Sequence, residues 1–212
     1  MRIVCISDTH GQHLSIPQLP EGDVIVHAGD ITEDGVLSLA CTFSRHFGNL
    51  DYPHKIVILG NHDTDLASEE ALAQFRQACI DNEVHFLHND SIEIDGVKFY
   101  GSPFTPAFGG YEFQLHGSEH ARRHWEMIPD DTQVLITHGP QSGILDVNAE
   151  GEHVGCQALM ARIEQLQCEL HVHGHIHEGY GEASSNGVRS VNAAVLDSRK
   201  RPWNRPIVVD LE

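Results

Sequence analysis

Positive charge is scarce in this sequence. The 212 residues include 13 Lys and Arg against 31 Asp and Glu, which gives a formal net charge of −18 at pH 7. Such an acidic surface repels polyanions, so we expect the protein not to bind long nucleic acid. The sequence also lacks an apolar run of about 18 residues, and it therefore predicts no membrane-spanning helix.

Cysteine is sparse as well. The five cysteines are an odd number and form no CxxC motif, so the sequence predicts neither a disulfide framework nor a cysteine-based zinc site. The chain starts directly with an apolar strand pattern and shows no signal-peptide core. Together these features predict a protein of the reducing cytoplasm.

Histidine, in contrast, is abundant, with 17 residues in the chain. Neutral imidazole is a common ligand of transition metals, so an acidic and histidine-rich chain suggests metal binding. The length suits one buried core, and no long linker or internal repeat divides the sequence. We therefore expect one domain over residues 1–212.

Short apolar segments rich in β-branched residues alternate with amphipathic segments along the chain. The apolar segments predict strands over residues 2–6, 24–28, 55–59, 97–100, 133–137, 170–173, 188–191 and 207–211. The amphipathic segments predict helices over residues 36–47, 68–82, 118–127 and 155–167. Ser68 has the position and side chain of a helix N-cap. This pattern indicates an α/β fold with mixed sheets.

Metal-binding residue types directly follow five of the predicted strands. The five turns are Asp8-Thr9-His10, Gly29-Asp30, Gly60-Asn61-His62-Asp63, His138-Gly139 and Gly174-His175-Ile176-His177. Loops at the carboxyl ends of neighbouring strands converge, so we expect these side chains to meet in one site. A single Asp or His in such a turn is usually an ordinary surface residue, but five such turns together indicate a metal centre.

The residue types suit two divalent cations. Two cations about 3.5–4 Å apart repel each other, so an anionic oxygen must lie between them, and a carboxylate can bridge where a neutral histidine cannot. Neutral His and Asn ligands leave positive charge available for a phosphate group. Mixed His, Asp and Asn ligands suit Mn, Fe, Zn, Co or Ni, and the sequence does not choose among these metals.

In this order, the five turns resemble the signature motifs of the calcineurin-like metallophosphoesterase superfamily. Residues 101–106, 137–140 and 175–181 are also similar to the small metallophosphoesterase domain-containing proteins, which resemble cyclic-nucleotide phosphodiesterases. The resemblance implies an α/β fold in the form of a four-layer sandwich, with two mixed β-sheets flanked by helices.

The resemblance also implies seven metal ligands. One metal ion would be bound by Asp8, His10 and His177. The other would be bound by Asn61, His138 and His175. Asp30 would bridge the two ions.

Two further residues receive roles from the same resemblance. His62 would stand beside the phosphate and stabilise or protonate the leaving group, and Asp63 would orient the His62 ring. After Asp30, residues 31–35 contain no Arg, whereas the Ser/Thr protein phosphatases of this superfamily carry one there. This difference disfavours a protein phosphatase.

The resemblance therefore predicts a dinuclear metal-dependent phosphodiesterase that acts on small phosphodiesters such as 3′,5′-cyclic nucleotides. In this hypothesis, a hydroxide that bridges the metals attacks phosphorus. A phosphomonoesterase or a nuclease on the same metal core remains an alternative. A third alternative is a non-catalytic scaffold, which the presence of every ligand and of His62 disfavours.

Four aromatic residues, Phe104, Phe108, Tyr111 and Phe113, occur close together in the sequence. Aromatic rings can stack on a nucleobase without strict sequence choice. Packing in the core beneath a long loop is the more common role for such residues. The sequence leaves both roles open.

Overall fold

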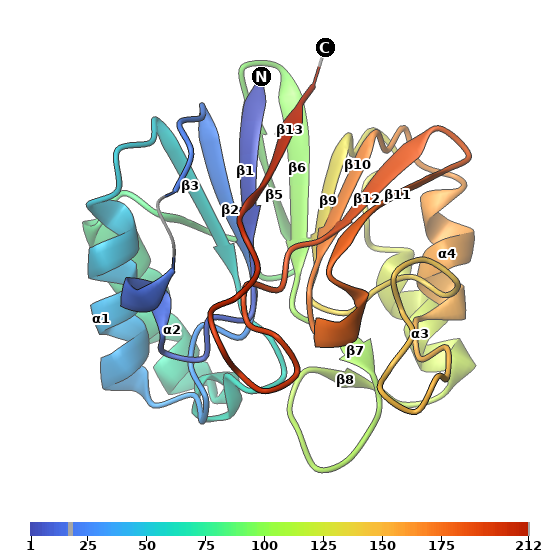
Figure 1. Cartoon of the computed structure of the whole chain (residues 1–212), viewed down its shortest axis with the longest axis horizontal. Coiled ribbons are helices and arrows are strands. Elements are labelled where there is room, and N and C mark those ends of the chain that lie inside the picture. Colours follow the sequence, from blue (N-terminus) through green and yellow to red (C-terminus); the bar gives the residue numbers. More distant parts are fainter. Residues whose placement is uncertain (17–18, 212) are drawn as a thin grey trace.

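Two β-sheets pack face to face, and two helices cover the outer face of each sheet. Figure 1 shows this arrangement in the computed structural model, which describes residues 1–16 and 19–211. The predicted four-layer α/β sandwich is therefore confirmed. Among the described residues, no helix combines the length and the apolar character needed to cross a membrane.

The first sheet has the strand order β13-β1-β2-β3-β4. Its strands are β1 (Arg2–Ile6), β2 (Val24–Ala28), β3 (His54–Ile58), β4 (His85–Phe86) and β13 (Ile207–Asp210). Strands β1 to β4 are parallel, and β13 pairs antiparallel with β1. Helices α1 (Leu37–Gly48) and α2 (Glu69–Asp81) flank this sheet.

The second sheet has the strand order β11-β12-β10-β9-β6-β5. Its strands are β5 (Asp90–Ile94), β6 (Val97–Ser102), β9 (Val134–Thr137), β10 (Leu170–His173), β11 (Gly181–Ser185) and β12 (Val188–Asn192). The four inner strands are parallel, and both edge strands are antiparallel. Helices α3 (Ser118–Trp125) and α4 (Gln157–Ile163) flank this sheet.

Smaller elements lie in the loops. A two-stranded parallel ribbon joins β7 (Thr105–Pro106) and β8 (Gln114–Leu115). Within the described part of the chain, the short 3₁₀ helices are η1 (His13–Ser15), η2 (Thr64–Ala67) and η3 (His177–Gly179).

Successive side chains along each strand point to opposite faces of the sheet, and the hydrophobic residues therefore form three cores. In β1, Ile3 and Cys5 face the core between the sheets, whereas Val4 and Ile6 face α1 and α2. A third core lies between the second sheet and its two helices, around Trp125. Because both faces of the central parallel strands are covered, strands such as β2 are buried at every position.

The predicted strands all exist, but the sequence reading missed β4, β5, β7, β8 and β11. The edge strands β5 and β11 carry mostly polar, solvent-facing side chains, so they lack the apolar pattern used to find strands. Helix α4 is shorter than predicted, because residues 155–156 and 164–167 lie outside it. The Ser68 N-cap is confirmed, since its hydroxyl accepts a hydrogen bond from the Ala71 amide at 3.3 Å.

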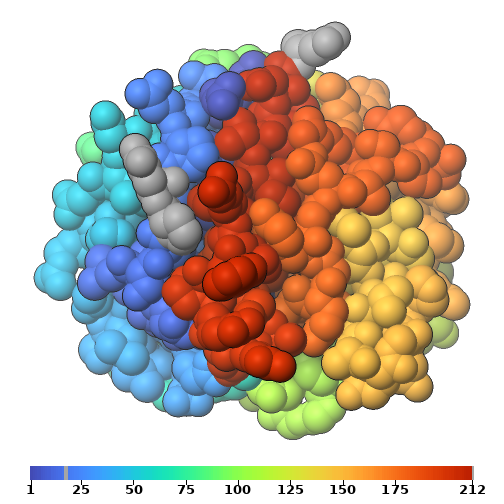
Figure 2. Space-filling model, viewed as in Figure 1, coloured from blue at the N-terminus to red at the C-terminus, as the bar shows by residue number. Residues whose placement is uncertain are grey.

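The segment after β12 passes from the second sheet to the first, where β13 pairs with β1. Figure 2 shows it in red along the seam between the N-terminal half in blue and the later part of the chain in orange and yellow. This segment therefore connects the two halves of the sandwich. The central parallel strands of both sheets end at the edge of the sandwich that lies lowest in Figure 1.

Candidate metal centre

The metal-binding residue types that follow the strands lie together at this edge. The Asp8 amide donates to the Gly29 carbonyl at 2.9 Å and the His10 amide donates to the Asp30 carbonyl at 3.0 Å, which join the loops after β1 and β2. The His175 amide donates to the Asp8 carboxylate at 3.0 Å. The loop after β10, in the second sheet, is thereby attached to the first sheet.

Three overlapping groups of side chains stand close enough to bind a metal ion. Within each group, one ligand atom from every residue lies within 4.8 Å of the others. The groups are Asp8 with His10 and His177, His10 with Asp30 and His62, and Asp8 with Asp30 and His138. Every member was singled out from the sequence, and the shared residues place the groups side by side.

Asp30 lies between two histidines, where a bridging ligand would stand. Its Oδ1 is 3.3 Å from Nε2 of His138, and its Oδ2 is 3.7 Å from Nε2 of His10. Burial would raise the pKa of Asp30, but the charge of His138 and the hydrogen bond between them outweigh burial and hold that pKa well below its usual range. The Asp30 carboxylate is therefore ionised.

The same interaction shifts the pKa of His138 in the opposite direction. Burial would lower its pKa, but the nearby Asp30 carboxylate raises the pKa of His138 to about 9. A metal ligand must be deprotonated, so a proton and a metal ion compete for Nε2 of this ring.

The outer nitrogens of two predicted ligands are occupied by backbone carbonyls. Nδ1 of His138 lies 2.9 Å from the Ala28 oxygen, and Nδ1 of His177 lies 2.8 Å from the Leu196 oxygen. A carbonyl oxygen can only accept, so Nδ1 carries the proton in both rings. Nε2 of His177 then faces the site, 3.6 Å from Oδ1 of Asp8. This support of the outer nitrogen is typical of metal-binding histidines.

His10 gives an independent sign that a ligand belongs here. The residue is 7% exposed, and neither ring nitrogen has a hydrogen-bond partner within the described structure. A Glu33 carboxylate oxygen lies 3.1 Å from Nδ1 without hydrogen-bond alignment, and Lys200 pairs with the same carboxylate. Unpaired buried polar atoms cost about 1–3 kcal/mol. A divalent metal at Nε2 would remove part of this cost, and the Asp, His and Asn donors fit such an ion.

Asn61 and His175 lie on the His138 side of the site. Oδ1 of Asn61 is 2.9 Å from Nε2 of His138. The His175 ring meets the His138 ring edge-on, with centroids 5.1 Å apart, although it lies outside the three groups above. Burial, followed by the charge of His138, lowers the pKa of His175 to about 3. His175 is therefore neutral, as a metal ligand must be.

His62 and Asp63 have different partners from those expected. Nδ1 of His62 lies 3.0 Å from the Glu33 carbonyl oxygen, so this carbonyl, in place of Asp63, orients the ring. The Asp63 carboxylate instead accepts hydrogen bonds from Gly60, Ile31 and Thr32, and so joins the loops after β2 and β3. Burial and the neighbouring Asp30 raise the pKa of Asp63 to about 7, against the effect of these donors.

Four residues of the site have a strained backbone conformation. Asp8, His10, Asp30 and His175 have φ angles of 55°, 42°, 54° and 67°, in the left-handed region that favours glycine. Strained non-glycine residues cluster at functional sites, where the surrounding structure holds them in place. The hydrogen bonds between the loops supply that restraint here.

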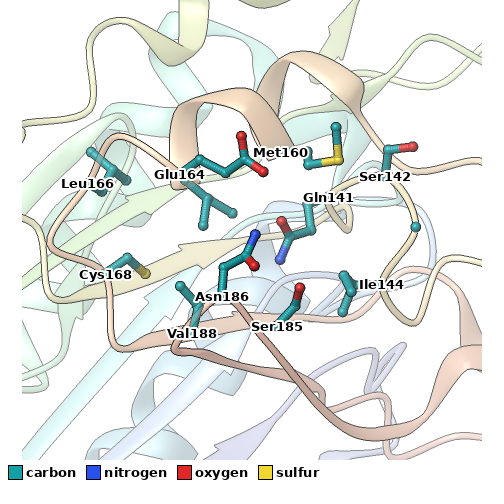
Figure 3. A pocket seen from close by; sticks show the side chains of 12 residues that line it. Gln141, Ser142, Ile144, Met160, Glu164, Leu166, Cys168, Ser185, Asn186 and Val188 are labelled. Atoms are coloured by element: carbon teal, nitrogen blue, oxygen red, sulfur yellow. The ribbon is translucent and has the colours of Figure 1, made fainter.

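The cavity in Figure 3 lies away from these residues. It measures about 530 Å³ and is lined by α4, the loop after β9, and the turn between β11 and β12. Its titratable lining residues are Glu164 and Cys168. Burial raises the pKa of the Cys168 thiol to about 12 and keeps it protonated. The cavity therefore offers one carboxylate and no histidine, unlike the candidate metal centre.

A family model described as "Calcineurin-like phosphoesterase" matches residues 1–179, which include all the residues of the centre. The chain belongs to this family. The resemblance seen in the sequence is thereby confirmed, and family and ligand groups together support a metal-dependent phosphoester hydrolase.

Relatives in this family span almost the whole chain. Human metallophosphoesterase domain-containing protein 1 is 38% identical over 232 residues, covering 99% of this chain and 71% of the relative. The UPF0046 protein K07C11.7 of Caenorhabditis elegans is 34% identical, covering 98% of this chain and 74% of the relative.

Solved structures share the fold at lower identity. TT1561 of Thermus thermophilus is 12% identical with a TM-score of 0.64, covering 99% of this chain and 98% of that one. The phosphopantetheinyl hydrolase of Mycobacterium tuberculosis is 18% identical with a TM-score of 0.58, covering 97% and 95% of the two chains.

Sequence reasoning missed the residues that support the calcineurin-like centre from outside. Glu33 contacts both His10 and His62, Thr32 holds Asp63, and the Leu196 carbonyl holds His177. Glu33 follows Asp30 by three residues, so an acidic side chain in the same turn was an available signal. The Leu196 carbonyl had none, because any residue type supplies a carbonyl.

Proposed function

We propose that this chain is a dinuclear metal-dependent phosphodiesterase that acts on small phosphodiesters such as 3′,5′-cyclic nucleotides. The observation that carries the proposal is the position of Asp30, whose two carboxylate oxygens face His138 on one side and His10 on the other. One ion would be bound by Asp8, His10 and His177, and the other by Asn61, His138 and His175, with Asp30 shared by both. When bound, divalent metals act as Lewis acids that neutralise phosphate charge and lower the pKa of water.

The protein's own groups would position the ester and protonate its leaving oxygen. The His62 ring donates from Nδ1 to the Glu33 carbonyl, and the His62 amide donates to Oδ1 of Asp30 at 2.9 Å. Backbone and ring are thus both held, and Nε2 remains available to the substrate. A proton on Nε2 would pass to the departing alkoxide, a contribution typically worth about 10²–10⁴-fold.

Metal content and turnover, measured in the same preparation, test this proposal. Substrates are an aryl phosphodiester, an aryl phosphomonoester and cyclic AMP, and the variants are Asp30→Asn and His62→Ala. We expect about two divalent ions per chain, a preference for diesters, weakened metal binding in Asp30→Asn, and a kcat about 10²–10⁴-fold lower in His62→Ala with metal retained. His120→Ala, which changes an exposed histidine of α3, is the matched control.

Each part of the proposal has a result that would overturn it. Fewer than two ions per chain after reconstitution would contradict the dinuclear centre. A strong preference for the monoester would replace the phosphodiesterase with a phosphomonoesterase. Undiminished turnover in His62→Ala would remove His62 from the reaction, and metal binding without any turnover would favour a scaffold.

A further inference from the structure

The cavity beside α4 offers a second place where a small molecule can bind. Its volume of about 530 Å³ lies in the range of ligand pockets in proteins. Figure 3 shows α4, the loop after β9, and the turn between β11 and β12 around it. None of its lining residues belongs to the three groups of the candidate metal centre. The cavity is therefore a separate feature of the molecule.

Much of the cavity lining is apolar. The hydrophobic side chains are those of Ile144, Met160, Ile163, Leu166 and Val188. Ile163 and Val188 are buried in the core beneath α4, whereas Met160 is 37% exposed. The Cys168 thiol, whose pKa burial raises to about 12, adds a neutral group. This part of the lining suits the hydrocarbon portion of a ligand.

The cavity lining carries one negative charge and no positive charge. Glu164 ends α4, where the C-terminal end of a helix favours cations. Figure 3 shows the Glu164 carboxylate directed into the cavity. The nearest basic residue of the helix, Arg162, pairs with Asp130 and donates to the Ile128 carbonyl instead. Within the part of the chain that the structure describes, the Glu164 carboxylate therefore has no cationic partner.

Gln141 supplies a buried hydrogen-bond acceptor to the same cavity. The residue is 5% exposed, and its Nε2 donates to the Ser190 hydroxyl at 3.1 Å. The amide nitrogen thus bonds to the second sheet, which leaves the carbonyl oxygen Oε1 for a ligand. The Asn186 amide and two serine hydroxyls add further acceptors. A primary ammonium group has three donors, which one carboxylate and these neutral acceptors can satisfy together.

We propose that this cavity binds a small organic monocation, a primary alkylammonium. Its ammonium group would lie at Glu164 and Gln141, and its hydrocarbon chain would lie against the apolar lining. One carboxylate matches one positive charge, whereas an anion would be repelled by Glu164 and would find no Lys, Arg or His in the lining. The formal net charge of −18 attracts cations to the protein as a whole. This inference does not rest on the proposed phosphodiesterase, because it involves no predicted metal ligand.

Two probes with the same hydrocarbon chain test the proposal. They are n-hexylamine, which is a cation at neutral pH, and n-hexanol, which is uncharged. Each is titrated into the isotope-labelled protein loaded with Zn²⁺, which is diamagnetic, and the side-chain amide signals of Gln141 and Asn186 are followed by NMR. We expect both probes to shift these signals, with a dissociation constant about tenfold lower for the amine.

Three variants separate the carboxylate from the rest of the cavity. Glu164→Gln keeps the size of the side chain and removes its charge, so it should bind the two probes equally. Glu150→Gln is the matched control, because it removes the same charge from an exposed position outside the lining, and it should retain the preference for the amine. Ser185→Tyr adds a large side chain to the lining and should weaken the binding of both probes. The midpoint of thermal unfolding should match the parent protein in each variant.

Several results would overturn the alkylammonium site. These are the absence of any shift at Gln141 and Asn186 in the parent protein, equal binding of both probes by the parent, and an undiminished preference in Glu164→Gln. An equal loss of preference in Glu150→Gln would assign the effect to the overall charge and would also overturn the site. Because no phosphoester is turned over in these measurements, their failure leaves the proposed function untouched.

Discussion

Thr32 shows how a single residue without a chemical role supports the centre. Its hydroxyl donates to Asp63 at 2.7 Å and accepts the Gly35 amide at 2.8 Å, and the residue is 1% exposed. Asp63 in turn receives the Gly60 amide, in the turn that carries Asn61 and His62. The hydroxyl therefore links two of the loops that form the site.

Replacing this hydroxyl by a methyl group should destabilise the protein. Thr32→Val preserves the side-chain shape but leaves the buried Gly35 amide without a partner, and Oδ1 of Asp63 keeps one donor, the Thr32 amide, instead of two. We expect the free energy of unfolding to fall by about 1–3 kcal/mol. Urea unfolding of the metal-free protein measures this change. Thr42→Val, at an exposed position of α1, should change it by less than about 0.5 kcal/mol. An equal effect of the two substitutions would contradict this account.

At the scale of the elements, the loops that follow the strands bring the two sheets together. The loops after β1 and β10 approach so closely at Gly174 that a Cβ there would overlap the Asp8 carboxylate and the Ser7 hydroxyl. The missing side chain thus permits the first sheet and the second sheet to meet at the predicted metal ligands.

Gly174→Ala should therefore displace Asp8 and weaken metal binding. We expect the affinity for a divalent metal, measured by titration of the metal-free protein, to fall at least about tenfold, the scale seen when support of a ligand is lost. Gly110→Ala, where a Cβ meets no atom within 4 Å, is the control and should bind metal like the parent protein. Unchanged affinity in Gly174→Ala would show that the two loops can separate without loss of the site.

Helices and strands were predicted correctly where the local sequence pattern itself determines the element. Strands buried on both faces, such as β2, are apolar at nearly every position, and α2 combines an N-cap with apolar spacing. The edge strands β5 and β11 were missed because they form by pairing with β6 and β12, which their own polar sequences do not reveal.

At the scale of the whole molecule, buried histidines make stability depend on pH. Burial lowers the pKa of His27 to about 3, and that of His88, His124 and His173 to about 4, from 6.5. At these four histidines, the unfolded chain therefore binds more protons than the folded one between about pH 4 and 6.5. The stability that comes from keeping these rings neutral is complete above pH 6.5 and is lost as the pH falls through this window.

His124 allows this dependence to be tested away from the metal ligands. The ring is buried between the second sheet and α3, with Nε2 3.0 Å from the Ser102 hydroxyl. In His124→Gln, the free energy of unfolding should fall less steeply between pH 6.5 and 4, by up to about 1.4 kcal/mol per pH unit. Urea unfolding at several pH values in the presence of a chelator measures the slope. An unchanged slope would contradict a neutral, buried His124.

The sequence by itself determined the fold class and the candidate residues of the centre. Strand periodicity is a local property, and the predicted ligands follow directly after strands, so their types and order were readable before any contact was known. Only the tertiary structure decided which groups meet across loops that are distant along the chain. The Glu33 carbonyl holds His62, Asp63 joins two loops, and Phe108 and Tyr111 leave the core for the metal centre. These contacts depend on how the two sheets pack, and no local pattern records that packing.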